Sequence, residues 1–304
     1  MELTWPIKIR ITIALMVGIL LLGVLGWQMV SPQNPMAPVA ILSGTIGVID
    51  IIACVGLAFL AGFISYFLCA PFGRQIAILA APGGMAIWSL RTGSMTSLLQ
   101  SDTSAEFRRT VYSSLRWEAP LWLIIAAAGL IGVLTAEKLS GKAKQLPVET
   151  DSKAKPTPNS YLLPIVSIFA SAIIARLCIG VLAMNITYFD IKFGQVVGQP
   201  APGQIAFAVI ISFAAAAFLL KFFLNTSYRW VAVSTVLLSI YIMTSYGTED
   251  ISNHMAASWP AAFFPYSGAA ILPVQMVTFG SIGAVFGYWA AVRYRYWRKH
   301  ESKG

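Results

Sequence analysis

Seven long apolar runs constrain the fold of this chain more than any other feature of its sequence. Each run is long enough to cross a lipid bilayer as a helix, which takes about 20 mostly apolar residues. The runs cover residues 11–30, 39–69, 120–136, 161–184, 205–224, 230–246 and 270–292. An eighth apolar segment, residues 76–90, is shorter and contains Pro82-Gly83-Gly84. This pattern predicts an all-α fold, a polytopic transmembrane helical bundle of about eight spans, seven long and one short.

The composition indicates a single membrane domain, residues 1–304. Charged residues make up 11% of the chain, against roughly 25% in soluble proteins. We expect two halves of four spans each, residues 1–137 and 161–304, the second ending in a short basic tail. The segment between the halves, residues 138–160, is rich in Lys, Ser and Pro, which predicts a flexible cytoplasmic linker.

The short segment at 76–90 decides the predicted topology. Seven crossings put the two ends of the chain on opposite sides of the membrane, whereas eight put them on the same side. Lys and Arg accumulate on the cytoplasmic side of membrane proteins. With eight crossings from a cytoplasmic N-terminus, 15 of the 21 Lys and Arg residues lie inside and 5 lie outside. We therefore predict eight spans with both termini in the cytoplasm.

The same topology explains the net charge of +9. Because the basic excess lies on the cytoplasmic side, it is a topology signal, and no nucleic-acid partner is expected. The expected location is the cytoplasmic membrane of a bacterium. The C-terminal tail, residues 293–299, combines Arg and Lys with Tyr and Trp, which favours anchoring at the headgroups of anionic lipids. Other membrane proteins are possible partners, and the sequence identifies none of them.

Pro82, Gly83 and Gly84 indicate a broken helix or a re-entrant segment. Proline removes a backbone donor, and glycine weakens a helix. Irregular backbone at membrane depth is tolerated only where protein or a water-filled cavity satisfies its polar groups. We expect this broken-helix segment to pack inside the bundle, whether it crosses the membrane or re-enters it.

Asp50 and Arg176 are the ionisable residues set well inside the apolar runs. A charge at such a depth costs about 2.5 to 3.5 kcal/mol and usually faces the bundle interior or a partner. With eight spans, both residues lie roughly 12 to 13 Å below the outer surface, at 1.5 Å per helical residue. The matched depths predict an intramembrane charged pair. Its role is either a structural clasp or the binding of an anionic or protonatable solute.

Small residues in the last apolar run predict close contact between helices. Gly283 and Gly287 form a GxxxG pattern, with Gly280 one turn earlier. This spacing lets two helix backbones approach closely and is common in membrane bundles. The three glycines are therefore candidate helix-packing residues.

A short amphipathic helix is predicted at residues 101–117, at the membrane surface. Phe107, Val111 and Leu115 recur every four residues and form one apolar stripe. Thr103 begins a capping-box pattern. Such a helix covers one end of the bundle, or serves as a gate or a docking helix.

No pattern in the sequence points to catalysis, a metal or a cofactor. Cys54, Cys69 and Cys178 lie in apolar runs, where a thiol behaves as a small apolar group. Asp250 and His254 are four residues apart, but two ligands do not make a metal site. We expect no catalytic residue, no metal and no cofactor, and hence a protein that is not an enzyme.

Two classes of function remain. The first is a permease-like or channel-like transporter of a small solute, with Asp50, Arg176 and the Pro82 segment lining a cavity. The second is a noncatalytic membrane scaffold or a subunit of a larger complex, in which these residues only hold the bundle together. An enclosed polar cavity between the helices would favour transport, and a dry, tightly packed interior would favour the scaffold.

Overall fold

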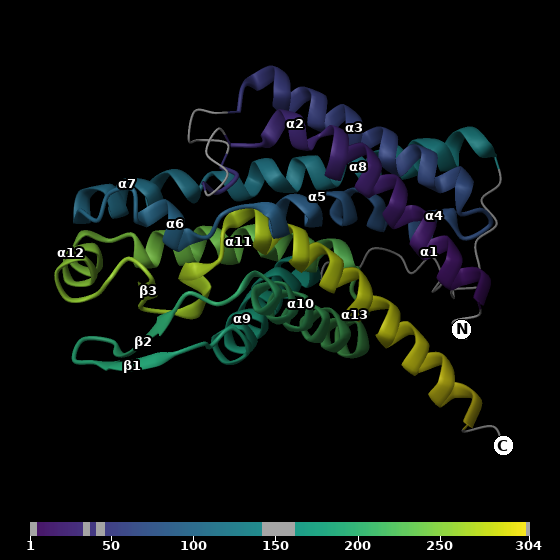
Figure 1. Ribbon diagram of the computed structural model, residues 1–304. Coiled ribbons are helices and arrows are strands. Elements are labelled where there is room, and N and C mark those ends of the chain that lie inside the picture. The colour runs from purple at the N-terminus through teal and green to yellow at the C-terminus, as the bar shows by residue number, and fades with distance from the viewer. Residues whose placement is uncertain (1–4, 33–36, 41–45, 142–161, 302–304) are drawn as a thin grey trace.

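The computed structural model describes residues 5–32, 37–40, 46–141 and 162–301, and it is mostly helical (Figure 1). The helices are α1 (Trp5–Gly18), α2 (Trp27–Val30), α3 (Val48–Leu68), α4 (Gly73–Ile76), α5 (Ala80–Arg91), α6 (Met95–Leu99), α7 (Ala105–Leu115), α8 (Glu118–Ser140), α9 (Leu162–Leu182), α10 (Pro202–Leu224), α11 (Tyr228–Tyr246), α12 (Glu249–Ser258) and α13 (Pro273–Glu301). A π-helical segment, η1 (Ile19–Leu25), follows α1, and two 3₁₀ turns are η3 (Ala77–Leu79) and η5 (Ser267–Ala270).

Six helical stretches within the described residues are long and apolar enough to cross a membrane. They are Trp5–Leu25, Val48–Leu68, Ala105–Ser140, Leu162–Leu182, Pro202–Leu224 and Pro273–Arg298. Helices α11 and α12 also pass together, with a bend of 68° between them, so the number rises to seven if the pair is one span. Length and apolarity together define a helical membrane protein.

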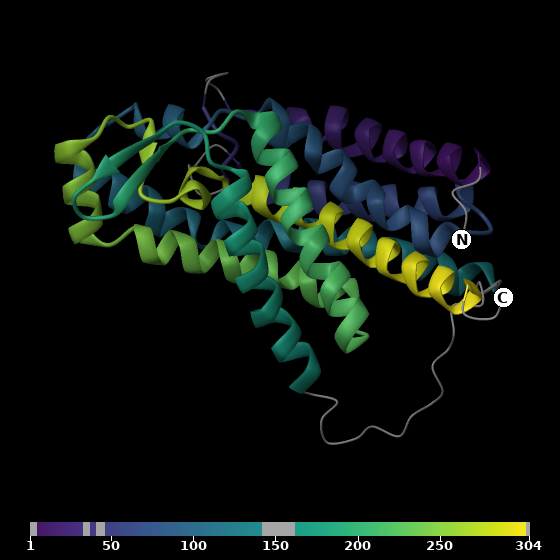
Figure 2. The same ribbon diagram turned by 90° about the horizontal axis from the view of Figure 1, so that it is seen from below.

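Most of the long helices run side by side between two ends of the molecule, while α9 and α10 are inclined to the others (Figures 1 and 2). Helix α1 begins and helix α13 ends at one of these two ends, which we call the terminal end. Helices α7 and α12 and the strands lie at the opposite end, which we call the sheet end. The first and the last long helices therefore have their outer ends on the same side of the bundle.

Helix pairs approach each other at glycines. Helix α3 packs along α8, where a Cβ built at Gly62 would lie 2.0 Å from the carbonyl oxygen of Gly129. Helix α10 packs along α13, where a Cβ at Gly287 would lie 2.0 Å from the carbonyl oxygen of Ala214. Side chains cannot occupy these positions, so backbone meets backbone, as the GxxxG pattern predicts.

The other two candidate packing glycines of α13 also face neighbouring helices. A Cβ at Gly283 would lie 2.3 Å from the carbonyl oxygen of Ile210, and one at Gly280 would lie 2.4 Å from the Thr235 side chain. Both distances are far below an ordinary carbon contact of about 3.5 to 4.0 Å. Gly280 therefore packs against α11, while Gly283 packs against α10.

Helices α4, η3 and α5 form one continuous helical stretch from Gly73 to Arg91. Pro82, Gly83 and Gly84 are buried in it, but they do not break it. They lie in the first turns of α5, where a proline is tolerated because the backbone donors there need no helical partner. The irregularity is the 3₁₀ turn Ala77–Leu79 just before them, so the predicted position of the break is corrected by a few residues.

The sheet end contains a small antiparallel sheet that the sequence pattern did not predict. Strands β1 (Thr187–Asp190) and β2 (Gly194–Gly198) form a hairpin, and β3 (Phe263–Phe264) pairs with β2. Gly194 has a φ of 74°, a left-handed conformation that glycine adopts without strain. The hairpin turn thus depends on a glycine inside a segment that otherwise connects two spans.

The predicted amphipathic helix is present as α7. Its N-cap is Ser104 and not Thr103, because the Ser104 hydroxyl accepts a hydrogen bond of 3.2 Å from the backbone N–H of Phe107. Val111 and Leu115 are buried, as the apolar stripe predicts. Most of the linker expected at residues 138–160 lies outside the described residues.

Candidate functional site

Asp50 and Arg176 do not form the predicted charged pair. Helix α3 begins at Val48, well after residue 39, so Asp50 lies in its first turn. One carboxylate oxygen accepts a hydrogen bond of 2.9 Å from the backbone N–H of Gly47. A carboxylate at a helix N-terminus satisfies a free donor and meets the positive end of the helix dipole. Asp50 therefore stabilises the start of α3, and the prediction of a clasp with Arg176 is wrong.

Arg176 instead lies among three tyrosines from two other segments, helix α11 and the residue that precedes η5. Its guanidinium carbon is 4.9 Å from the ring centroid of Tyr241 and 5.7 Å from that of Tyr266. The Tyr246 side chain lies near the guanidinium and stacks on Tyr266, with centroids 5.7 Å apart. The Tyr266 hydroxyl donates to the backbone carbonyl of Arg176. We call these four residues the arginine–tyrosine site.

The arginine–tyrosine site has no acidic member among the described residues. The ion pairs of the described chain lie elsewhere: Arg74–Glu137, Arg109–Glu249, Lys192–Asp250 and His254–Asp190. A cation–π contact stabilises an arginine by about 0.5 to 2 kcal/mol but does not neutralise it. The guanidinium charge of Arg176 is therefore uncompensated by any described carboxylate.

A second cation, which is buried, lies at the sheet end, in α7. Arg108 is 4% exposed, and its Nη1 atom has no hydrogen-bond partner among the described residues. Its neighbour Tyr112, one turn on, is also buried and donates a 3.3 Å hydrogen bond to the carbonyl of Ala269. Sequence reasoning counted Arg108 only as an outer positive charge.

Asp190, at the end of β1, is the most extensively hydrogen-bonded carboxylate of the sheet end. One oxygen contacts His254 Nε2 at 2.8 Å and accepts a 2.7 Å bond from Trp259 Nε1. The other accepts 2.8 Å bonds from the backbone N–H groups of Lys192 and Phe193. Burial by itself would raise the pKa of this carboxyl group, but the four hydrogen bonds hold the pKa well below its usual range.

The Asp190 site ties the hairpin to α12. The Asp190 side chain is 4% exposed, and His254 and Trp259 reach it from α12 and from the residue that follows α12. Within the described residues, no group of three or more His, Cys, Asp and Glu side chains gathers as metal ligands. A charged carboxylate that accepts four hydrogen bonds stabilises the contact between the hairpin and α12. In the sequence, the only indication of this site was the spacing of Asp250 and His254 on one helix face.

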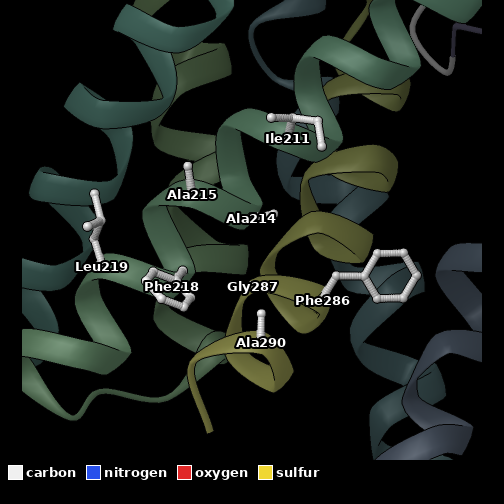
Figure 3. Close-up of a pocket in the computed structure, with 8 residues that line it drawn as sticks. All are labelled: Ile211, Ala214, Ala215, Phe218, Leu219, Phe286, Gly287 and Ala290. Atoms are coloured by element: carbon white, nitrogen blue, oxygen red, sulfur yellow. The ribbon is translucent and has the colours of Figure 1, made fainter. Parts of the chain in front are cut away.

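A groove of about 450 Å³ opens between α10 and α13 on the outside of the bundle (Figure 3). It is lined by apolar and small residues: Ile211, Ala214, Ala215, Phe218, Leu219, Phe286, Gly287 and Ala290. Its floor lies where Gly287 contacts the α10 backbone. None of these lining residues is charged or polar, so the groove lacks the groups that would bind a charged solute.

Comparison with protein-family models, with curated proteins and with solved structures finds no match to this chain. The evidence on function therefore comes from its own residues.

Proposed function

We propose that the chain crosses the membrane eight times, with both ends in the cytoplasm of a bacterium. The stretch Gly73–Arg91 supports this count, because at about 1.5 Å per residue it is roughly 28 Å long, close to the thickness of the hydrocarbon core. Residues 76–85 of this stretch are all buried, so it is surrounded by protein and needs fewer apolar residues than a span that faces lipid. Both the start of α1 and the end of α13 lie at the terminal end (Figure 1), and Lys8, Arg10, Arg293, Arg295 and Arg298 belong to these two helix ends.

A topology experiment tests the eight crossings. A reporter that is active only in the cytoplasm is inserted at residue 150 in one version of the protein and fused to the C-terminus in another. Both reporters are expected to be active, and a third reporter placed after Ser101, at the sheet end, is expected to be inactive. Opposite results at residue 150 and at the C-terminus would overturn the eight-span arrangement.

We propose further that the protein is a noncatalytic scaffold or a subunit of a membrane complex. The observation that carries this proposal is the backbone contact at Gly62 and Gly287, one in each half of the chain. The residues expected to line a cavity support it as well. Asp50 caps a helix, and Pro82, Gly83 and Gly84 are buried against other helices. Such an interior stabilises the bundle and leaves its outer surfaces for lipids and partner proteins.

A permease-like or channel-like protein is the second candidate, and the arginine–tyrosine site favours it. Uncompensated cations in membrane segments are costly and often mark the path of a solute. Arg176 and Arg108 would then bind an anionic solute along its path. A transporter of this kind requires water to reach the interior of the bundle during transport, whereas a scaffold does not require it.

The natural cysteines of the chain separate the two candidates. Cys54 and Cys69 are fully buried on α3 and at its C-terminal end. In the scaffold, a small, charged thiol reagent is expected to leave both unmodified in proteoliposomes, as measured by mass spectrometry of peptides. The same reagent should modify an exposed control thiol introduced as Ser101→Cys. Modification of Cys54 in the folded protein would show water at that depth and would favour the permease.

The basic tail is proposed to bind anionic lipid on the cytoplasmic side. Arg295 is held in place, because it donates hydrogen bonds of 2.9 Å to the Asn225 side chain and of 2.6 Å to the carbonyl of Phe222. Arg293 and Arg298 are exposed on the same helix. Each basic residue near an anionic surface contributes about 1 kcal/mol to membrane attraction.

A further inference from the structure

We propose that the arginine–tyrosine site binds a phosphate group, with Arg176 as the main ligand. The carrying observation is a fixed guanidinium in a candidate span with aromatic partners and no described counter-ion. Phosphate fits because a guanidinium has five N–H donors in a planar fork, which matches two oxygens of a phosphate. This inference goes beyond the scaffold role and does not depend on it.

The tyrosines position the guanidinium and leave donors available. The guanidinium carbon lies over the rings of Tyr241 and Tyr266, and a cation–π contact of this kind does not use up the N–H donors as hydrogen bonds to a carboxylate would. Tyr246 also lies near the guanidinium, stacked on Tyr266. The Tyr266 hydroxyl, bonded to the backbone carbonyl of Arg176, fixes this turn of α9 against the segment before α13. The cation is therefore held ready before a ligand arrives.

The site can be reached from outside the bundle. Tyr241 is 44% exposed, and Arg176 is partly exposed. Arg176 lies six residues before the end of α9 at Leu182, a depth of roughly 9 Å at 1.5 Å per residue. A long arginine side chain at this depth reaches toward the headgroup level. Two sources of phosphate can therefore arrive: the phosphodiester of a membrane lipid, or free phosphate and phosphomonoesters from the water.

Three carboxylates of the sheet end are already engaged with other partners, so they do not serve as the counter-ion of Arg176. Asp190 accepts four hydrogen bonds, while Asp250 and Glu249 pair with Lys192 and Arg109. Among the described residues, none of these three acidic side chains pairs with Arg176. A bound phosphate would supply the missing negative charge.

Thermal unfolding of the delipidated protein in mild detergent tests the proposal. The probes are phosphatidylglycerol, a diacylglycerol with the same acyl chains, and sodium phosphate against sodium chloride at equal ionic strength. If lipid is the source, phosphatidylglycerol raises the melting temperature more than diacylglycerol does. If the source is soluble, sodium phosphate raises it more than sodium chloride does. Either rise supports the site, and the absence of both overturns it.

Matched variants assign the effect to Arg176. Arg176→Gln is expected to weaken phosphate binding by about tenfold or more, since a charge-assisted hydrogen bond contributes about 1.5 to 3 kcal/mol. Arg91→Gln is the control, because Arg91 also rests on an aromatic ring, that of Trp27 at 4.6 Å. It should bind as the wild type does. Equal binding by Arg176→Gln and the wild type would overturn the proposal.

A conservative variant separates the effect of the guanidinium's planar shape from the effect of its positive charge. Arg176→Lys keeps the positive charge but loses the planar fork, so it should fold like the wild type and bind phosphate several-fold more weakly. The lysine variant also tests the site if Arg176→Gln fails to fold. A lysine variant that binds as tightly as the wild type would overturn the role of the fork.

Discussion

Replacing Gly62 by alanine is expected to destabilise the protein by about 2 kcal/mol. The new Cβ would lie 2.0 Å from the carbonyl oxygen of Gly129, a backbone atom of α8 that cannot rotate away. Helices α3 and α8 would have to separate along their contact, which reduces packing on both sides. The strain exceeds the gain of about 0.5 to 1 kcal/mol that alanine gives over glycine inside a helix.

Gly56→Ala is the matched control for this prediction. Gly56 lies on the same helix, α3, but a Cβ there would have no atom within 4 Å. The control should therefore show only the helix-propensity gain and become slightly more stable. Stability is measured as the mole fraction of SDS that unfolds each variant in mixed micelles, followed by tryptophan fluorescence. If Gly62→Ala and Gly56→Ala unfold at the same mole fraction, the close contact of α3 with α8 is wrong.

This contact belongs to the part of the fold that the sequence could predict. Apolar length identifies spans without any knowledge of neighbours, because the bilayer sets the required length. Small residues at a spacing of four identify where helices touch, as at Gly283 and Gly287. The stripe of Val111 and Leu115 predicted α7 for the same reason: a helix in contact with one apolar surface repeats every three to four residues.

The charged pair shows where sequence reasoning failed. Its depth argument assumed that the second apolar run is one helix from residue 39, so that Asp50 would lie two turns inside. A helix start cannot be located by hydropathy when apolar residues precede it. Gly47 followed three residues later by Asp50 is a capping pattern, in which the acidic side chain satisfies a free backbone donor. That local signal was present in the sequence.

The two polar sites, at Asp190 and at Arg176, had little local signal for their partners. Asp190 meets His254 and Trp259, more than 60 residues away in the chain, and Arg176 meets Tyr266, 90 residues away. Such sites depend on how loops and helix ends assemble, which spacing along one element does not encode. The sequence identified Arg176 only as a charge inside an apolar run, without its tyrosine partners, and a single acidic residue such as Asp190 in an outer loop did not stand out.

Asp190→Asn is expected to have the largest effect at the sheet end, with a loss on the order of 3 kcal/mol. The amide keeps one accepting oxygen, but its NH₂ group would face donors that the carboxylate now satisfies. Either His254 and Trp259 or the backbone N–H groups of Lys192 and Phe193 would lose their partner. The hairpin and α12 should then separate, and their backbone amides should exchange hydrogen faster than those of the spans. Hydrogen-exchange mass spectrometry resolves this local change.

Asp250→Asn is the matched control, because it makes the same chemical change on the same side of the bundle. The Asp250 side chain is 80% exposed and pairs with Lys192 at 2.6 Å. Exposed ion pairs contribute less than about 1 kcal/mol, so exchange at the sheet end should change little. If Asp250→Asn accelerates exchange as much as Asp190→Asn does, the buried carboxylate is not what holds the hairpin to α12.

The pH dependence gives an independent measure of the same site. Because the pKa of Asp190 is lower in the folded protein than in the unfolded chain, the unfolded chain binds a proton more readily as the pH falls. The stabilisation by Asp190 is therefore complete near neutral pH and decreases below about pH 5, as the pH passes the ordinary aspartate pKa of about 3.9 and approaches the folded value. Hydrogen exchange of the hairpin should accelerate over this range in the wild type, after correction for the intrinsic pH dependence of exchange. The Asp190→Asn variant should exchange rapidly at every pH tested, and a wild-type hairpin whose corrected exchange stays constant down to pH 3 would contradict the charged state of Asp190.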